Sequence, residues 1–279
     1  MNNKLTDYVI LLSLFLLNNL SGNNELLPCL TPEPSLELVQ STLNDFNEYK
    51  RENQENRETY PVHIFVAWHV IYNSNNAGYI SMNVIENAIS KINQEYNPHN
   101  LFFTLDTVTY HQNNEWWGTF TGSNQDPNEE DMRSSTYIDP AHYYNIWSTD
   151  LSGTGACAWN YFPNSGENSY WQGTTTDVDC IGGNSTTLVH ELGHYFYLFH
   201  TFQYGCSSPG DAVEDTPRHT DVDGSYPCNP QLDTCPDHDG LDPVSNFMNY
   251  TPDACQSELS EGQVERLFWA IENYHPSLL

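Results

Sequence analysis

The chain has 279 residues, which is enough for one or two domains with a sizeable hydrophobic core. Its 8 Lys and Arg residues against 37 Asp and Glu residues give a formal net charge of −29, a field that repels nucleic acids and anionic membranes. We therefore expect neither as a partner, and we expect affinity for cations or basic peptides unless the acidic residues only keep a secreted protein soluble.

Residues 1–22 are predicted to be a secretory signal peptide. Lys4 precedes a mostly apolar run of nine residues, 9–17, whereas a membrane-spanning helix needs about 20. No other stretch of the sequence is long and apolar enough to span a bilayer. We therefore expect a secreted, extracellular protein, in which the seven cysteines form disulfides with one left over.

Residues 23–59 are predicted to be a prosegment or N-terminal extension that precedes a main domain at residues 60–279. The segment is polar and rich in Glu, Asn and Gln, with few apolar residues and no sustained apolar face. Its Cys29 stands far from the other six cysteines, which all lie in the second half of the chain. Cys29 is therefore the candidate for the unpaired cysteine.

The beginning of the main domain predicts an α/β layer. Residues 61–72 are apolar on both alternating faces, as in a buried central strand. Residues 81–96 have apolar side chains at helical spacing, and further strands are expected at 101–110 and 145–149. This order of strands and helix predicts a sheet whose face is covered by helices.

Residues 190–202 carry the clearest chemical motif of the chain. On a helix, His190 and His194 lie on one face one turn apart, so both can bind the same small cation. Glu191 points aside, where it can accept a proton from a water at the open position of the metal. If the chain turns back after the helix, His200 completes the three imidazoles of a catalytic zinc site. The motif predicts a zinc hydrolase with Glu191 as general base.

The order H-E-x-x-H-x-x-G-x-x-H resembles the metzincin metallopeptidases, whose second mark is a methionine turn beneath the metal. Residues 245–250, with Met248, match such a turn, and together with Thr201 and Phe202 they resemble the pappalysin (M43, ulilysin-like) family. Tyr197 stands where that pattern has glycine, and a left-handed tyrosine costs about 1–2 kcal/mol. We expect either a strained Tyr197 or a different turn before His200.

The resemblance implies a metzincin-type α/β (α+β) fold. Its N-terminal subdomain would contain a twisted mixed sheet, a backing helix and the active-site helix. Its smaller, loop-rich C-terminal subdomain would contain the Met-turn and a terminal helix, for which residues 260–263 supply a capping box. Residues 60–279 would then be the catalytic domain of a secreted zinc metalloendopeptidase, and we expect a monomer. The alternative is a weakly active or inactive, zinc-stabilised secreted binding or effector domain.

Extended polypeptides are the expected substrates, because residues 156–163 occupy the family's sheet edge, to which a peptide can add as a strand. Met248 would form an apolar floor under the zinc. The Tyr250 phenol can hydrogen-bond the tetrahedral oxyanion, a contact that is worth a few kcal/mol; a buried structural tyrosine is the alternative. Asp253 lies where the family builds its S1′ wall and would favour Arg or Lys in the substrate.

Cys29 suggests a latency mechanism, because a thiolate is a good zinc ligand and can occupy the position of the water. The alternative is a cysteine that is free or paired elsewhere. Spacing alone does not define disulfide connectivity. The resemblance implies the pairs Cys206–Cys235, Cys228–Cys255 and Cys157–Cys180.

Residues 206–243 contain nine acidic residues and one basic residue. Clustered carboxylate and carbonyl oxygens suit calcium, and residues 210–217 resemble a stretch that is associated with calcium in the family. A solvated acidic loop is the alternative. The candidate calcium ligands are Asp211, Asp215, Thr216 and Asp221.

Overall fold

The computed structural model describes residues 28–53, 60–122 and 126–279. The predicted signal peptide, residues 1–22, lies outside the described residues. The helices are α2 (Leu36–Glu52), α3 (Met82–Tyr96), α4 (Pro127–Thr136), α5 (Thr187–Tyr195) and α6 (Glu261–Tyr274). The strands are β1 (Val62–Tyr72), β2 (Leu101–Gln112), β3 (Tyr143–Thr149), β4 (Ala158–Asn160) and β5 (Thr174–Asp177). Short 3-10 helices are η1 (Asn97–His99), η2 (Pro163–Ser165), η3 (Val178–Cys180), η4 (Asp253–Cys255) and η5 (Pro276–Leu278).

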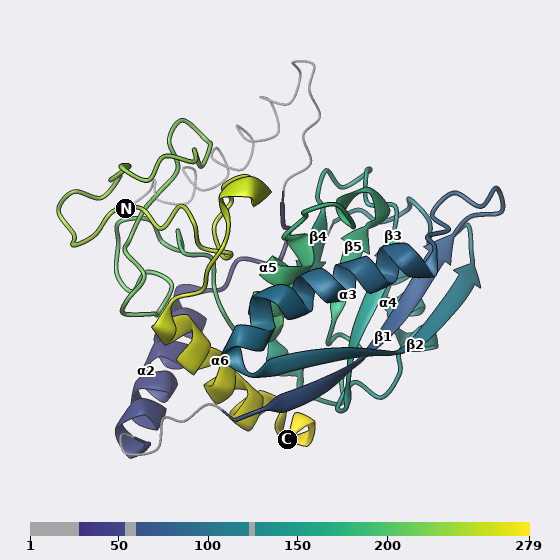
Figure 1. Ribbon diagram of the computed structural model, residues 1–279, viewed down its shortest axis with the longest axis horizontal. Helices are drawn as coiled ribbons and strands as arrows, with labels where there is room; N and C mark the ends of the chain where they lie inside the picture. The colour runs from purple at the N-terminus through teal and green to yellow at the C-terminus, as the bar shows by residue number, and fades with distance from the viewer. Residues whose placement is uncertain (1–27, 54–59, 123–125) are drawn as a thin grey trace, which may run out of the picture.

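The strands form one mixed sheet in the order β2-β1-β3-β5-β4, and β4 alone runs antiparallel to its neighbour β5. Helix α3 lies along one face of this sheet (Figure 1). The strand predicted at 61–72 is buried on both faces only from Val66 onward, because His63 and Phe65 point to solvent. The predicted mixed sheet, its backing helix and the terminal helix with its capping box are confirmed.

One continuous core joins the sheet to the helices. Ile85, Ile89 and Ile92 of α3 are buried in it with the active-site helix α5 and with Leu267 and Ile271 of α6. The apolar spacing that predicted α3 is therefore the face that packs on the sheet. Helix α5 packs against β4, β5 and α3, and the Tyr96 hydroxyl of α3 donates to the Val189 carbonyl of α5 at 2.8 Å.

Helix α2 lies in the predicted prosegment, where no helix was expected. Ser35 caps it by accepting a hydrogen bond from the Leu38 amide, and Val39 and Phe46 are buried. The Phe46 ring lies 5.6 Å from the ring of Trp269, so α2 packs against α6 (Figure 1). This part of the prosegment is therefore docked on the main domain by apolar contacts.

Residues 196–260 contain little regular structure, as expected for a loop-rich second part. Three disulfides form, Cys157–Cys180, Cys206–Cys235 and Cys228–Cys255, and these are the pairs that the resemblance implied.

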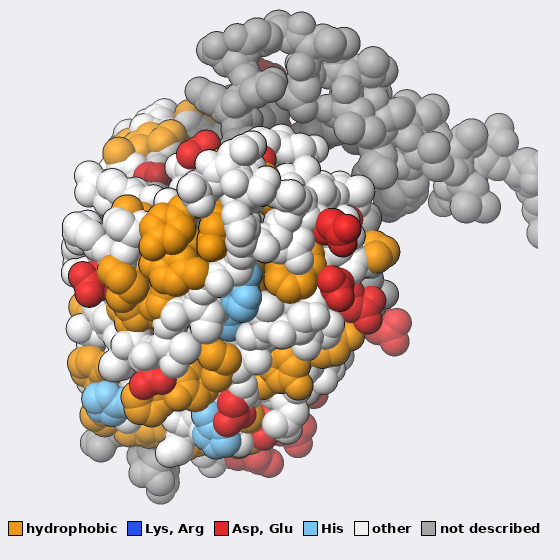
Figure 2. Space-filling model, turned by 90° about the vertical axis from the view of Figure 1, so that its right-hand side faces the viewer, with side chains coloured by type: hydrophobic (Ala, Val, Ile, Leu, Met, Phe, Trp, Pro, Cys, Tyr) orange, Lys and Arg blue, Asp and Glu red, His pale blue; other side chains and the backbone are white. Residues whose placement is uncertain are grey.

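Acidic side chains are scattered among hydrophobic side chains and histidines on the face shown in Figure 2. In the described part of the chain, no helix is long and apolar enough to cross a membrane.

Candidate active site

Helix α5 presents His190 and His194 to one point, and backbone carbonyls orient both rings. The Nδ1 atom of His190 donates to the Phe247 carbonyl at 2.7 Å, and that of His194 donates to the Leu198 carbonyl at 2.8 Å. Such bonds fix the tautomer and leave each Nε2 lone pair free for a metal. The Nε2 atom of His194 lies 3.1 Å from the Nε2 atoms of both His190 and His200.

Tyr197 ends the helix in the left-handed conformation, with φ 66°. Its amide donates to the His194 carbonyl at 2.9 Å, and the Leu198 amide donates to the Gly193 carbonyl at 2.8 Å. The strained alternative is therefore the one the structure adopts, and the turn still brings His200 to the other two histidines.

The three histidines suit a zinc ion. Burial lowers the pKa of His190 to about 4 and lowers the pKa values of His194 and His200 well below 6.5, so the rings are neutral at pH 7. Neutral imidazoles whose lone pairs converge at this distance are stable only around a cation. Three nitrogen ligands, with room for a fourth group, match a catalytic zinc site.

Cys29 joins this cluster. Its Sγ atom and the ring nitrogens of His190, His194 and His200 all lie within 4.8 Å of one another, and all four residues are buried. Cys29 is outside every disulfide of the structure. The latency hypothesis suggested this position for Cys29, and the fold brings the cysteine and the histidines together although at least 160 residues of sequence separate them.

Glu191 faces the same space, and the N-terminal segment covers it. Its Oε2 atom accepts a hydrogen bond from the Thr31 hydroxyl at 3.3 Å, while its Oε1 atom has no hydrogen-bond partner in the described ranges of the chain. Burial raises the pKa of Glu191 to about 8, although hydrogen bonds from Cys29 and Thr31 act in the other direction. The sequence analysis did not single out Thr31, whose only signal is its position two residues after Cys29.

The segment that carries Cys29 runs between the sheet edge and the Met-turn. The Leu30 amide donates to the Ala158 carbonyl of β4, and the Asn160 amide donates to the Thr31 hydroxyl, each at 2.9 Å. On the other side, the Tyr250 hydroxyl donates to the Cys29 carbonyl at 3.0 Å. The edge that was expected to bind substrate is therefore occupied by the chain's own N-terminal segment.

Met248 packs directly against the active-site helix. It is fully buried, and a Cβ atom placed on Gly193 would lie only 2.2 Å from its Sδ atom. The Thr201 amide donates to the Met248 carbonyl at 3.1 Å, which links the turn to the residue after His200. Gly193 is thus required by the close approach of the methionine.

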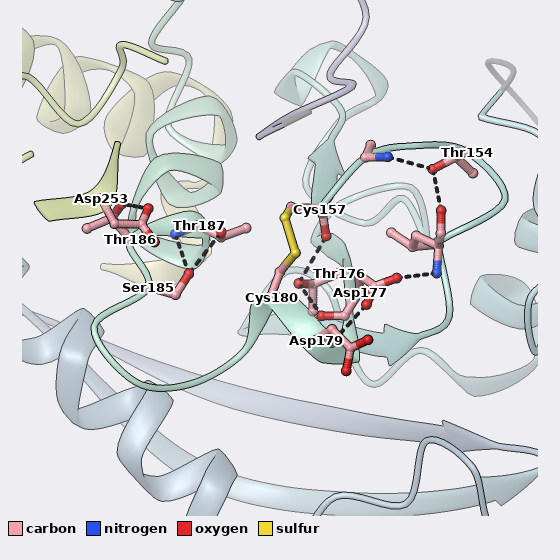
Figure 3. The surroundings of a disulfide bond; sticks show 12 residues. Thr154, Cys157, Thr176, Asp177, Asp179, Cys180, Ser185, Thr186, Thr187 and Asp253 are labelled. Atoms are coloured by element: carbon pink, nitrogen blue, oxygen red, sulfur yellow. Dashed lines mark hydrogen bonds between the residues drawn. A yellow bond between two sulfur atoms is a disulfide. The ribbon is translucent and has the colours of Figure 1, made fainter. Parts of the chain in front are cut away.

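Tyr250 and Asp253 both lie near the histidines. The Tyr250 ring is 4.8 Å from the His200 ring and 5.8 Å from the His190 ring, measured between centroids. Asp253 is exposed, and its carboxylate accepts a hydrogen bond from the Thr186 hydroxyl at 2.7 Å beside the start of α5 (Figure 3). Both residues follow Met248 in the chain, so the segment after the Met-turn supplies this side of the site.

The candidate calcium ligands are only partly brought together. Asp211 is buried and accepts hydrogen bonds from the Thr216 hydroxyl at 2.7 Å. Asp215 instead caps α6 through Ser260, and Asp221 accepts from the Gly224 amide within its own turn. Across the described residues, the only group of three or more His, Cys, Asp or Glu side chains with converging ligand atoms is the cluster around Cys29.

A buried ion pair that the sequence analysis missed supports the β4 edge. Arg133 donates to Glu129 at 2.7 Å, and both side chains are fully buried. Glu129 also accepts hydrogen bonds from the Trp159 indole at 2.7 Å and the Tyr161 hydroxyl at 2.8 Å. The two residues are one helical turn apart in α4, but nothing in the sequence shows that this turn is buried.

Two histidines on one helix, a third beyond a left-handed corner, an adjoining glutamate and a methionine beneath them define a metzincin-type zinc metallopeptidase. The sequence model of the peptidase M43 family, described as pregnancy-associated plasma protein-A, matches residues 128–272. The chain belongs to this family, the pappalysins, as the sequence motifs predicted. The alternative of an inactive binding domain finds no support.

Fungal proteins named extracellular metalloprotease are similar to this chain. The protein from Neurospora crassa is 34% identical over 223 residues, which is 75% of each chain. The protein from Sordaria macrospora is 33% identical over 226 residues, which is 76% of each chain. A protein from Colletotrichum graminicola is 31% identical over 259 residues, which is 86% of this chain and 89% of the Colletotrichum protein. The extracellular relatives agree with the predicted secretion.

Two solved structures share the fold. A mutant of promirolysin from Tannerella forsythia has a TM-score of 0.69 and 21% identity, covering 88% of this chain and 92% of its own. Mirolysin in complex with a compound has a TM-score of 0.66 and 22% identity, covering 79% of this chain and 96% of its own. The predicted metzincin-type fold is confirmed by this likeness.

Proposed function

We propose that this chain is the latent precursor of a secreted zinc metalloendopeptidase. In this proposal His190, His194 and His200 hold the zinc, and Cys29 of the prosegment, residues 23–59, occupies the fourth position. The convergence of these four residues within 4.8 Å is the observation that carries the proposal. The greater coverage of the chain by promirolysin, 88%, than by mirolysin, 79%, agrees with an N-terminal prosegment.

The catalytic roles follow from the positions of the side chains. When bound, zinc supplies a Lewis acid and lowers the pKa of a water toward about 7. Glu191 accepts a proton from the attacking water while the new carbon–oxygen bond forms. The same carboxyl then protonates the amine nitrogen as the carbon–nitrogen bond breaks. Tyr250 would donate a hydrogen bond to the oxyanion once Cys29, whose carbonyl it now binds, has left.

Latency would involve more than the cysteine. Residues 29–31 cover the zinc position, the general base Glu191 and the free edge of β4 together. Helix α2 anchors this segment by packing Phe46 against α6. Removal of the residues before Tyr60 would therefore release the metal position, the base and the substrate edge in one event.

Substrates would bind as extended polypeptides along the vacated edge of β4, through backbone hydrogen bonds such as those now made by Leu30. The exposed carboxylate of Asp253 beside α5 would favour a basic residue on the leaving side of the scissile bond. Of the candidate calcium ligands, only Asp211 and Thr216 meet, and the Arg266 guanidinium, which donates to the Asp211 carbonyl at 2.9 Å, would compete with a calcium ion at that place.

The test is to load the purified full chain with cobalt in place of zinc and to follow its spectrum and its peptide cleavage. We expect a thiolate-to-cobalt absorption band and no cleavage before processing, and loss of the band with onset of cleavage after removal of the segment before Tyr60. Cys29→Ser is the matched control, because it should lack the band from the start. A full chain that cleaves peptides at the processed rate would contradict latency.

A further inference from the structure

Tyr197 is the residue of the metal loop that departs from the family pattern, and its backbone is left-handed at φ 66°. An L side chain in this conformation is unfavourable, and glycine is the usual residue at such a helix end. Tyr197 is nevertheless almost fully buried, at 1% exposure. Its side chain must therefore make contacts that offset the backbone cost.

These contacts begin at the terminal helix. The Tyr197 ring stacks on Trp269 at 5.8 Å with an angle of 15° between the planes, and it meets the edge of Tyr274 at 4.9 Å. The buried guanidinium of Arg266 lies 5.9 Å from the Tyr197 ring and 4.4 Å from the Phe199 ring. A glycine at position 197 would lack the contacts with Trp269, Tyr274 and Arg266.

The hydroxyl group also contacts the segment that continues β4. It donates a hydrogen bond to the side chain of Asn164 in η2. From the same segment, the Phe162 ring lies 5.7 Å from the Tyr197 ring and packs edge-on at 5.6 Å against the ring of His194. The side chain of Tyr197 thus connects the metal loop to both α6 and the sheet edge.

We infer that Tyr197 is a positioning residue, which holds the loop between His194 and His200 against Asn164 and so fixes the third metal ligand relative to the sheet edge. In this chain, side-chain anchoring replaces the conformational freedom of glycine. The inference rests on the proposed role of the three histidines as zinc ligands. It concerns how firmly they hold the metal, which is measured apart from peptide cleavage.

The test compares zinc release from the full chain and its variants to a chromophoric chelator, at a temperature well below unfolding. Tyr197→Phe and Asn164→Ala both remove the hydrogen bond between these two side chains, so each should release zinc about fivefold faster or more. Tyr197→Phe also removes the contact of the hydroxyl with Thr42, so the double variant should be no faster than Tyr197→Phe alone. Tyr195→Phe is the matched control and should leave the rate unchanged, because the buried Tyr195 hydroxyl has no hydrogen-bond partner among the residues that the structure describes.

Tyr197→Gly restores the family residue and separates the two contributions. It relieves the left-handed backbone but removes the ring contacts, and we expect zinc release more than tenfold faster than in the parent chain. Release at the parent rate in both Tyr197→Phe and Asn164→Ala, or additive effects in the double variant, would overturn the inference even if unfolding midpoints fall. A parent chain that binds no zinc would instead refute the proposed metal site.

Discussion

The residues before and after His200 are ordered in different ways. Residues 62–195 contain the sheet, α3 and α5, so backbone ladders and a continuous apolar core hold them. Residues 201–259 contain η4 as their only described helix or strand. Two disulfides, hydrogen bonds within turns and a few residues of the core, among them Phe247 and Met248, hold this part. The regular part presents two histidines and the base, whereas the irregular part closes the site from below.

The two parts depend on each other at the metal position. The Phe247 carbonyl of the irregular part orients His190 of the regular part, and Met248 fits only because position 193 is glycine. Helix α5 supplies His190, but the orientation of its ring depends on the loop that carries Phe247. Substitutions in the two parts should therefore affect the site in different ways, and the following variants distinguish them.

The largest effect is expected at the base itself. Glu191→Gln keeps the size of the side chain but removes its proton acceptor, so peptide cleavage by the processed enzyme should fall by about 10²–10⁴-fold. Zinc content should remain at that of the parent, because the three histidines are untouched. Cleavage within tenfold of the parent would show that another group takes the proton.

Arg133→Met should strongly destabilise the regular part. It leaves the fully buried Glu129 without its partner, which costs about 3–5 kcal/mol of unfolding free energy in urea titrations. The double variant Glu129→Gln with Arg133→Met should recover much of that loss, since no buried charge remains. Equal instability of the single and double variants would mean that the arginine matters through its other contacts. These are its hydrogen bonds to the Trp171 and Gly173 carbonyls and the Thr175 hydroxyl, and its packing on Trp147, 4.5 Å away.

Removing the Cys206–Cys235 bridge should affect the irregular part by a comparable or smaller amount. The pair is separated by 29 residues, and opening a loop of this size costs about 3.6 kcal/mol in the chain-entropy description. In a variant with both cysteines changed to serine, limited proteolysis should cut between positions 206 and 235 while β1 to β5 stay protected. First cuts within the sheet would show that the two parts unfold together.

The smallest effect concerns pH and the buried histidine of the sheet. Burial lowers the pKa of His69 to about 4 from 6.5, and its ring lies 2.9 Å from both Thr109 and Asn145. The unfolded chain takes up this proton below pH 6.5, but the folded chain resists until about pH 4, so stability falls with acid in that window. Between pH 7 and pH 5 the loss should be about 2 kcal/mol.

His69→Gln should lack this part of the acid dependence, whereas His142→Gln should retain it, because His142 is exposed. Urea unfolding of both variants and the parent at pH 7 and pH 5 gives the comparison. An identical acid dependence in all three chains would place the proton uptake elsewhere.

Regular spacing made part of this structure predictable. The apolar period of α3, the run that became β1 and the pattern of His190, Glu191 and His194 each describe a face of a single element, which neighbouring residues determine. Helix α2 was missed because its short apolar face is flanked by polar residues. Strand β4 was expected only through the family resemblance, as the sheet edge at residues 156–163, and β5 was missed, because three and four residues give no readable alternation.

By itself, the sequence determined which side chains carry the chemistry: three histidines, a glutamate and a methionine turn at family spacing. Only the tertiary structure decided that Cys29 and Thr31 lie over them, that Tyr197 accepts a left-handed backbone, and that Glu129 and Arg133 support the edge of the sheet. The physical reason is distance along the chain. The spacing of apolar residues predicts which neighbouring residues share one face of a helix or strand. Contacts between residues 160 positions apart depend instead on how the whole core packs.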